Sequence, residues 1–232
     1  MRYKTLIFDA DDTLFDFKAS EKEALEKTLL EYKINYNEEY HLTAYKNINT
    51  KIWKELEDGK ITQRELKVER FKRYCDYLKY DFNPYEFSQK YMENLSNSSI
   101  LFEESLELIK TLAKNFKLLI ITNGLTKVQS GRIKKSLIAP YFEDIIISEE
   151  VGISKPNPEI FRLSLEKNNI FSKEEILMIG DNLGSDIKGG LNFGIDTCFY
   201  NPERKEIKGD IKPTFEIKKL NELFKILQKP QK

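Results

Sequence analysis

Short apolar runs alternate with amphipathic segments along much of the chain. The first run is KTLIF at residues 4–8, and LLII, DIIIS, ILMIG and DTCFY follow between residues 118 and 200. Helix-like segments separate these later runs. Because a strand that is covered on both faces is apolar along its whole length, such runs separated by helices are typical of parallel sheets. The pattern predicts an α/β fold with a doubly wound, mostly parallel sheet.

The pattern between about residues 18 and 95 is helical throughout. It contains long stretches such as SEKEALEKTLLEYK and TQRELKVERFKRYCDYL. Gly59 lies where a helix commonly ends in a left-handed residue. Two residue pairs have the spacing of a capping box at a helix start: Ser20 with Glu23, and Thr62 with Glu65.

The helical stretch interrupts the α/β region. One predicted strand precedes it, and the polar sequence NLSNSS at residues 94–99 separates it from the other strands. We therefore expect an α/β core formed by residues 1–16 and 99–232, and a helical cap formed by residues 17–98.

Composition excludes several classes of protein. Of the 232 residues, 40% are apolar and 33% are charged, which is ordinary for a folded globular chain. Basic and acidic residues number 38 each, so no overall field draws the protein to nucleic acid or to an anionic membrane. The N-terminus fits neither a signal peptide nor a membrane span, and we expect a cytoplasmic protein with a small-molecule substrate.

Cysteine and histidine offer little chemistry in this chain. Cys75 and Cys198 are too few for a disulfide framework or a zinc site, and we expect both to be core thiols. His41 is the only histidine, so a His-dependent triad or a multi-histidine metal site would have to use it. Its helix-like surroundings favour a structural role.

Three carboxylates follow the first apolar run in FDADDTLF, residues 8–15. Asp9, Asp11 and Asp12 are costly to place at the end of a buried strand, because like charges at close range resist ionising together. A solvated turn is the simplest interpretation. A functional cluster would instead need a cation, a proton or a hydrogen-bonding partner.

Polar residues at the other predicted strand ends favour the functional interpretation. In parallel sheets the carboxyl ends of the strands meet at one edge, where sites form. The runs LLII and ILMIG lead directly into polar residues, and DIIIS does so after a short connection. These residues are Thr122 and Asn123 after the second strand, Ser154 and Lys155 after the third, and Asp181 and Asn182 after the fourth.

Four motifs in this order resemble those of the haloacid dehalogenase superfamily. They are DADDT at 9–13, TNG at 122–124, SKPNPEIF at 154–161 and GDNLGSD at 180–186. The helical insert resembles the α-helical cap that many members carry. Within the superfamily, the chain is most similar to bacterial pyrimidine 5′-nucleotidases of the house-cleaning type, on the stretches FDADDTLFDF, WKELEDGKITQRELKVERF, IITNGLTKVQSGRI and ISEEVGISKPNPEIF.

The resemblance implies a Mg²⁺-dependent phosphomonoester hydrolase that works through an aspartyl phosphate. Asp9 would be the nucleophile. Asp11 would protonate the leaving oxygen and later activate water. Thr122, Asn123 and Lys155 would bind the phosphoryl group.

The metal ligands also follow from the resemblance. Asp9 and Asp181 would supply carboxylate oxygens, which are the ligands that Mg²⁺ prefers. Asp11 would contribute its backbone carbonyl. Asp186 would reach the ion through water or steady its ligands.

Several neighbouring residues receive other roles. Asp12 and Asp16 do not match ligand positions, and we expect them to be solvated or to stabilise the loop. Thr13 would orient the loop and Asp11. Aromatic residues of the predicted cap could stack on a nucleobase, although packing inside the cap is the favoured interpretation: Phe17, Tyr45, Trp53 and Phe71.

Alternative functions stay open at this point. Another small phosphomonoester, such as a sugar phosphate or phosphoglycolate, could be the substrate, and a phosphomutase would use the same pair of aspartates. A haloalkanoate dehalogenase would share the fold but would need neither Mg²⁺ nor the second acid, so Asp11 argues against it. An inactive binding protein would be expected to lack at least one of the catalytic residues, yet all are present.

Overall fold

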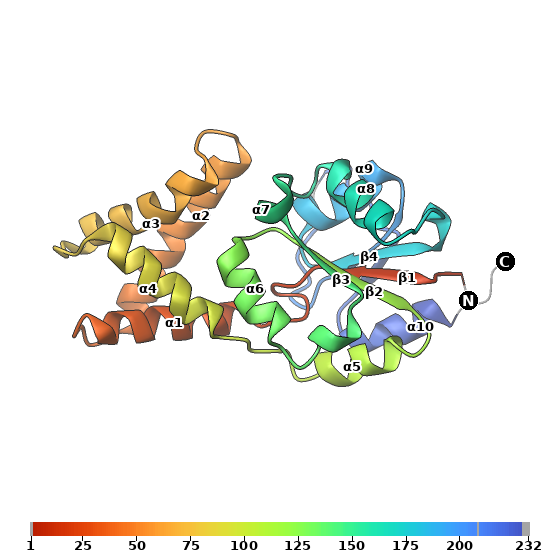
Figure 1. Ribbon diagram of the computed structural model, residues 1–232, viewed down its shortest axis with the longest axis horizontal. Coiled ribbons are helices and arrows are strands. Elements are labelled where there is room, and N and C mark those ends of the chain that lie inside the picture. The colour runs from red at the N-terminus through yellow and green to blue at the C-terminus, as the bar shows by residue number, and fades with distance from the viewer. Residues whose placement is uncertain (1, 208, 229–232) are drawn as a thin grey trace.

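In the computed structural model, which describes residues 2–207 and 209–228, six parallel strands form one sheet. Their order is β3-β2-β1-β4-β5-β6, and every neighbouring pair is parallel. The predicted doubly wound, mostly parallel sheet is confirmed (Figure 1). The strands are β1 (Thr5–Phe8), β2 (Lys117–Thr122), β3 (Asp144–Ile147), β4 (Ile176–Gly180), β5 (Asp196–Tyr200) and β6 (Phe215–Ile217).

The central strands are apolar on both faces because each face meets its own set of helices. Leu6 pairs with Leu118 of β2 and Leu177 of β4, and all three belong to one buried cluster. Their neighbours Ile7 and Leu119 belong to a second cluster on the other face. The alternation of side chains along a strand therefore divides each apolar run between two cores.

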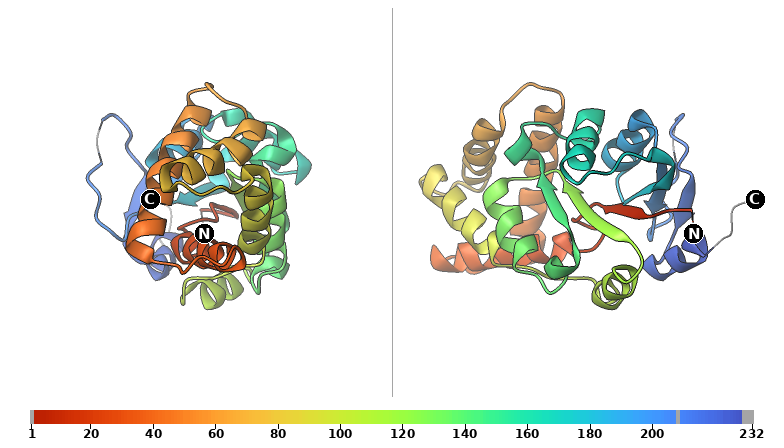
Figure 2. Two further views of the ribbon diagram at one scale, coloured as in Figure 1. Left: turned by 90° about the vertical axis from the view of Figure 1, so that its left-hand side faces the viewer. Right: turned by 45° about the vertical axis from the view of Figure 1, so that its right-hand side comes forward.

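Helices cover both faces of the sheet (Figures 1 and 2). They are α5 (Ser105–Leu112), α6 (Thr126–Lys134), α7 (Ser148–Val151), α8 (Pro158–Lys167), α9 (Lys188–Phe193) and α10 (Leu223–Leu227). Residues of α5 and α10 join the cluster that contains Leu6, and residues of α8 join the cluster that contains Ile7. Short helical turns occur at Ala139–Tyr141, Lys173–Glu175, Leu183–Ile187 and Leu220–Glu222.

The sixth strand does not follow from the apolar pattern. β6 has three residues at the edge of the sheet, and the middle one, Glu216, is exposed. Only Ile217 at its end is fully buried. An edge strand this short carries too few apolar residues to be recognised from sequence.

Four α-helices and a π-helical turn form the segment that interrupts the core. This helical segment consists of α1 (Phe17–Glu31), η1 (Glu38–Leu42), α2 (Thr43–Glu57), α3 (Gln63–Leu78) and α4 (Pro84–Ser96). Its own buried cluster is rich in aromatic rings, and it includes Leu125 just before α6 and Val128 on α6. The segment lies beside the carboxyl edge of the sheet (Figures 1 and 2).

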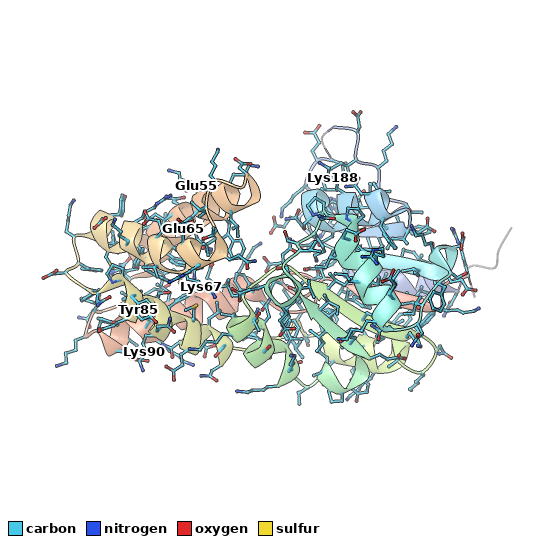
Figure 3. The ribbon with its side chains drawn as sticks, turned by 45° about the horizontal axis from the view of Figure 1, so that its top comes forward. Glu55, Glu65, Lys67, Tyr85, Lys90 and Lys188 are labelled. Carbon is cyan, nitrogen blue, oxygen red and sulfur yellow. The ribbon has the colours of Figure 1, made fainter. Side chains whose placement is uncertain are left out.

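Ion pairs also join the helical segment to the core. Lys67 of α3 lies 2.7 Å from Glu149 of α7, and Lys18 of α1 lies 2.8 Å from Glu203. Figure 3 shows Lys67 where the helical segment approaches the core, whereas Glu55 lies farther out on it. The domain boundaries given above remain a prediction, and residues 229–232 of the predicted core lie outside the described residues.

Two of the predicted helix ends are confirmed and one is wrong. Thr62 forms a reciprocal capping box with Glu65 at the start of α3, and Gly59 after α2 has a φ of +70°. The predicted capping box at Ser20 is wrong, because α1 begins at Phe17. Asp16 caps it by accepting a hydrogen bond of 2.8 Å from the Ala19 amide.

The remaining predictions about single residues can be checked in the same structure. Cys75 and Cys198 are free and buried, as expected. His41 is buried in the helical segment, with Nε2 2.8 Å from the hydroxyl of Tyr80, which supports its structural role. Burial lowers its pKa. Within the described ranges, no helix is both long enough and apolar enough to span a membrane.

Candidate active site

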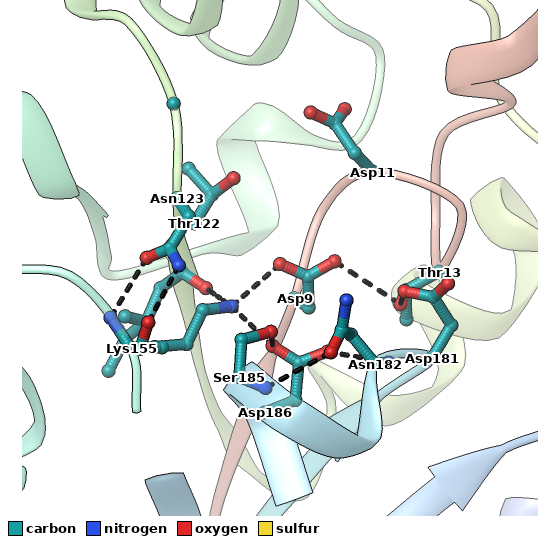
Figure 4. A network of polar contacts seen from close by, with 12 residues as sticks. Asp9, Asp11, Thr13, Thr122, Asn123, Lys155, Asp181, Asn182, Ser185 and Asp186 are labelled. Carbon is teal, nitrogen blue, oxygen red and sulfur yellow. Dashed lines mark hydrogen bonds and ion pairs between the residues drawn. The ribbon is translucent and has the colours of Figure 1, made fainter. Parts of the chain in front are cut away.

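The polar residues after the strands meet at one point, as the sequence predicts (Figure 4). The ammonium of Lys155 is at the centre. Its Nζ lies 2.7 Å from Asp9 Oδ1 and 2.7 Å from Asp186 Oδ1, and it donates a third hydrogen bond of 2.6 Å to the carbonyl of Ile121. Lys155 therefore links the ends of β1, β2 and β4.

Burial makes this charge network strong. Lys155 is 3% exposed, and burial opposes its charge. The carboxylates of Asp186 and Asp9 outweigh that effect and hold the Lys155 pKa above its ordinary value. The ammonium stays charged at any physiological pH, so it is suited to attract a phosphoryl oxygen.

The carboxylates outnumber the lysine. Burial raises the pKa of Asp9 well above its usual value, Lys155 opposes this rise, and Asp186 and Asp181 add to it. Burial, with Asp186 and Asp12, likewise raises the pKa of Asp181 to about 7. If Asp9, Asp181 and Asp186 are ionised together, their negative charge exceeds the single positive charge of Lys155.

A hard divalent cation fits this excess. Asp9, Asp181 and Asp186 each place one carboxylate oxygen within 4.8 Å of the others. Mg²⁺ prefers oxygen ligands and commonly binds one or two carboxylates, with water and phosphate oxygens completing its shell, so this cluster can supply the carboxylates. Such an ion would lower the pKa of each carboxyl group and keep it ionised.

Hydrogen bonds from its own loop fix the side chain of Asp186. Its Oδ2 accepts a hydrogen bond of 3.0 Å from the Asn182 amide, and its Oδ1 accepts one of 3.2 Å from the Ser185 hydroxyl. Gly180 makes room for it, because a Cβ there would lie 2.3 Å from Asp186 Oδ2. Both oxygens of Asp186 are already engaged, which suits the predicted contact with an ion through water.

The Asp11 carboxylate turns away from Asp9 (Figure 4). Gln129 Nε2 donates to it at 2.8 Å and Arg132 Nη1 at 2.5 Å. Gln129 also donates to the Thr122 hydroxyl at 2.9 Å. In this conformation Asp11 must rotate before it can reach an ester bound above Asp9.

Gln129 and Arg132 were not identified as site residues from sequence. Both lie on α6 three residues apart and both are buried, Arg132 completely. Arg132 Nε donates to the carbonyl of Ser98, where the chain returns from the helical segment. Two long polar residues at helical spacing within the run after TNG were the available signal.

The structure gives Thr13 a different contact from the predicted one. Its hydroxyl lies 3.4 Å from Asp9 Oδ2 and 3.4 Å from Asp181 Oδ1, and Asp11 is held by α6 instead. Thr13, four residues after Asp9 in the loop, therefore bridges the two carboxylates.

The Asn123 side chain holds the loop that carries Lys155. Its side chain donates to the Lys155 carbonyl at 2.9 Å and accepts from the Lys155 amide at 2.9 Å. It therefore fixes the backbone of Lys155, and a direct contact with phosphate remains a prediction.

The other two acidic residues of the loop differ from one another. Asp16 was expected to be solvated or to stabilise the loop, and the structure shows that it caps the start of α1. Asp12 adopts a left-handed conformation with φ of 58°, and its Oδ1 is buried with no hydrogen-bonding partner among the described residues. Asp12 is half-buried, and burial raises its pKa. Of the two expected roles, solvation does not describe this oxygen, and stabilising the loop stays a prediction.

A cleft of about 500 Å³ opens above these groups. Its floor contains Asp9, Lys155 and Asp181. Its opposite wall comes from the helical segment and is lined by Phe17, Asn49, Trp53, Leu56, Gln63 and Arg70.

The aromatic candidates separate into two pairs. Phe17 and Trp53 line the cleft and are half-buried. Tyr45 and Phe71 lie fully buried inside the helical segment, so the favoured packing interpretation is confirmed for these two.

Comparison with known proteins decides the family. The family described as haloacid dehalogenase-like hydrolase matches residues 6–200. The chain belongs to the haloacid dehalogenase-like hydrolases. The predicted resemblance is thereby confirmed, and membership identifies the protein as a hydrolase.

Whole-chain relatives support the assignment to this hydrolase family. The HAD-hydrolase YfnB of Bacillus subtilis is 39% identical, and the match covers 97% of this chain and 96% of YfnB. Pyrimidine 5′-nucleotidase PynA of Streptococcus pneumoniae is 36% identical over 99% of this chain and 97% of its own length. Pyrimidine 5′-nucleotidase YjjG of Escherichia coli is 31% identical over 99% and 100%.

Solved hydrolase structures agree. The crystal structure of YfnB bound to magnesium, described as revealing interdomain movement, superposes with a TM-score of 0.92 over 98% of this chain and 100% of YfnB. The L-2-haloacid dehalogenase of Xanthobacter autotrophicus superposes with a TM-score of 0.75 over 97% and 98%, at 16% identity. The second likeness shows the fold alone.

Proposed function

We propose that this hydrolase is a Mg²⁺-dependent phosphatase of nucleoside 5′-monophosphates, with a pyrimidine nucleotide as its substrate. The observation that carries the proposal is the meeting of Asp9, Lys155 and Asp181 at the floor of one cleft. The named nucleotidases PynA and YjjG, which match the whole chain, support the choice of substrate.

The positions of Asp9 and Lys155 support the following proposed reaction. An Asp9 carboxylate oxygen attacks phosphorus, and the bond between phosphorus and the ester oxygen breaks to leave an aspartyl phosphate. Asp11, after rotating towards the ester, gives its proton to the departing oxygen. A water then attacks the aspartyl phosphate while Asp11 takes its proton, and inorganic phosphate leaves with Asp9 restored.

The other residues bind and orient the phosphoryl group. Lys155 and the Thr122 hydroxyl contact its oxygens, and Asn123 fixes the backbone of Lys155. Asp9, Asp181, the Asp11 backbone carbonyl and, through water, Asp186 would hold Mg²⁺, which neutralises the phosphoryl charge when bound. We also propose that residues 17–98 form the cap and residues 1–16 and 99–232 the core, in a cytoplasmic protein.

The rival functions make different demands. A dehalogenase has no use for a second acid in the place of Asp11, so chloride release from 2-chloropropionate is expected to be absent. A phosphomutase would return a phosphoryl group to the sugar rather than to water. The YjjG and PynA likeness favours hydrolysis.

A substrate panel tests the proposal. Purified protein with Mg²⁺ is assayed for phosphate release from UMP, dUMP, TMP, AMP, ribose 5-phosphate, glucose 6-phosphate and phosphoglycolate, with and without a chelator. We expect kcat/KM to be largest for the pyrimidine nucleotides and activity to disappear with chelator. Equal rates on the hexose phosphate would remove the nucleotidase assignment, and no phosphate release from any ester would remove the phosphatase.

A further inference from the structure

Arg70 in the wall of the cleft has unused hydrogen-bonding capacity. It is 4% exposed yet lines the cleft. Among the described residues its one hydrogen bond goes from Nη1 to Asn49 Oδ1, at 3.1 Å, and no carboxylate lies within ion-pair distance. Its Nε is buried with no partner there. Because a guanidinium has five N–H donors and a buried donor without an acceptor is costly, the wall favours a ligand that brings one.

Aromatic packing fixes the position of this guanidinium. Its Cζ lies 4.7 Å from the ring centre of Phe71, 5.3 Å from that of Tyr91 and 5.8 Å from that of Tyr45. These cation–π contacts stabilise the charge but accept no hydrogen bond along the N–H directions. Arg70 is therefore held in place for an acceptor that arrives from the cleft.

Asn49 extends the hydrogen-bonding edge of the wall. Its Nδ2 donates to Glu21 Oε1 at 3.1 Å, which orients its Oδ1 towards Arg70. Asn49 is half-buried and lines the cleft. One N–H and one lone pair of its amide remain for a ligand, in addition to the donors of Arg70.

The charge of the wall favours a neutral ligand over an anion. Glu21 is 5% exposed and is linked to Arg70 through the Asn49 amide. When ionised, its carboxylate balances the guanidinium, so a carboxylate-bearing leaving group would gain little from the charge of Arg70. A carbonyl oxygen satisfies the open donors without adding a second negative charge.

Trp53 adds a flat apolar surface beside this edge. It lies one helical turn after Asn49 on α2, and both line the cleft. A side chain four residues along a helix lies on the same face. An indole next to hydrogen-bonding groups suits a planar ring with polar edges, which is the shape of a nucleobase.

We propose that Arg70 and Asn49 form the base-recognition subsite, with Arg70 donating to the C2 carbonyl oxygen of a pyrimidine that stacks on Trp53. This inference rests on the proposed nucleotidase function. Uracil, thymine and cytosine share the C2 carbonyl and adenine lacks it, so the subsite supplies a chemical reason for selecting pyrimidines.

The test compares substrates within each variant. Arg70→Gln is expected to lower the ratio of kcat/KM for UMP to that for ribose 5-phosphate by about 10- to 100-fold, the range for losing a charged hydrogen bond. The preference for UMP over AMP falls with it. Arg73→Gln is the matched control: Arg73 lies on the same helix, pairs with Glu55 and Glu69, and is absent from the cleft lining. Its selectivity ratios are expected to equal those of the wild type.

Binding of uridine, measured by calorimetry, separates this inference from the proposed function. If the wild type hydrolyses UMP and Arg70→Gln keeps the wild-type ratios and uridine affinity, the subsite is wrong and the nucleotidase stands. If the wild type neither hydrolyses UMP nor binds uridine, both are wrong. A loss in Arg70→Gln confined to phosphoglycolate would identify a carboxylate site and overturn the base subsite.

Asn49→Leu provides a second variant in case Arg70→Gln does not fold. Asn49 is half-buried, so its replacement disturbs the aromatic cluster less than loss of the buried guanidinium. We expect it to lower the same UMP to ribose 5-phosphate ratio. An unchanged ratio in a folded Asn49→Leu protein, judged by its circular dichroism, would also overturn the subsite.

Discussion

The floor and the wall of the cleft satisfy their charges in opposite ways. On the floor, Lys155 donates to two carboxylates and a carbonyl, and each of these partners belongs to the core. On the wall, Arg70 makes a single hydrogen bond among the described residues. The ammonium on the floor therefore has its hydrogen-bonding partners before any ligand binds, although the carboxylates there still favour a cation. The guanidinium on the wall needs a ligand to supply further acceptors.

This difference indicates that the floor binds the phosphoryl group and the wall recognises the leaving group. Every phosphate ester presents the same phosphoryl group, so a prearranged floor can serve all of them. Leaving groups differ in shape and polarity, and beyond the ester oxygen that Asp11 would protonate they face the wall. Floor substitutions should thus affect all substrates equally, and wall substitutions should affect some more than others.

Asp9→Asn is the most severe test of the floor. An amide cannot form the aspartyl phosphate, so we expect kcat to fall by several orders of magnitude on every ester, with the fold intact. Phosphate release and thermal unfolding are measured side by side. Turnover comparable to that of the wild type with Mg²⁺ would end the assignment of Asp9 as the nucleophile.

Asp11→Asn removes the proposed acid and base, which α6 holds away from Asp9. We expect a fall of about 10²–10⁴-fold in kcat on UMP, because its alkoxide leaves poorly without a proton. The first step on p-nitrophenyl phosphate should be less affected, since that leaving group needs no proton. Rapid-mixing measurements of nitrophenol release resolve this step, and an equal loss on both esters would contradict an acid role.

Lys155→Met tests whether one cation holds the floor together. We expect kcat to fall by about 10²–10³-fold on all esters. Because two buried carboxylates lose their partner, the metal-free protein should also lose about 3–5 kcal/mol of unfolding free energy. Lys188→Met, which removes an exposed lysine of α9, is the control. Unfolding curves that coincide for the two variants would show that the network contributes no stability.

The floor could be predicted from sequence because Asp9 and Asp181 directly follow strands and Lys155 follows one after a short connection. Each apolar run ends at a polar residue, and the rule that parallel strands share a carboxyl edge brings Asp9, Thr122 and Asp181 together. Their partners on α6 could not be derived in this way. Gln129 and Arg132 lie 118 and 121 residues from Asp11 in the chain, and no local pattern fixes which buried polar side chain a helix turns towards a loop.

The wall was harder to predict for a related reason. Arg70 lies in a run of charged residues on α3, where a guanidinium looks like any solvated side chain. Only the packing of α3 against α2 and α4 shows that it is buried.

At the start of α1, a capping-box spacing at Ser20 competed with Asp16 four residues earlier. Spacing alone does not show which acceptor begins the helix.

Glu21→Gln tests the charge balance of the wall with the smallest expected effect. Burial raises the Glu21 pKa from 4.5 to about 7; Arg70 and Lys46 oppose this rise, and Asp12 and Asp11 add to it. A raised carboxyl pKa favours the folded state at low pH, and this stability is lost as the pH rises from about 4.5 through 7. At ~1.4 kcal/mol for each pH unit, a shift from 4.5 to about 7 makes this loss at most about 3.5 kcal/mol.

Glutamine resembles the neutral acid at every pH, so the variant should match the wild type near pH 5 and unfold at a higher temperature at pH 8. Glu26→Gln on the same helix is the control for the substitution itself. If Glu21→Gln and the wild type lose stability in parallel between pH 5 and 8, Glu21 does not titrate in this range. The carboxyl group would then keep one protonation state across this range, and the charge balance of the wall would not depend on pH near neutrality.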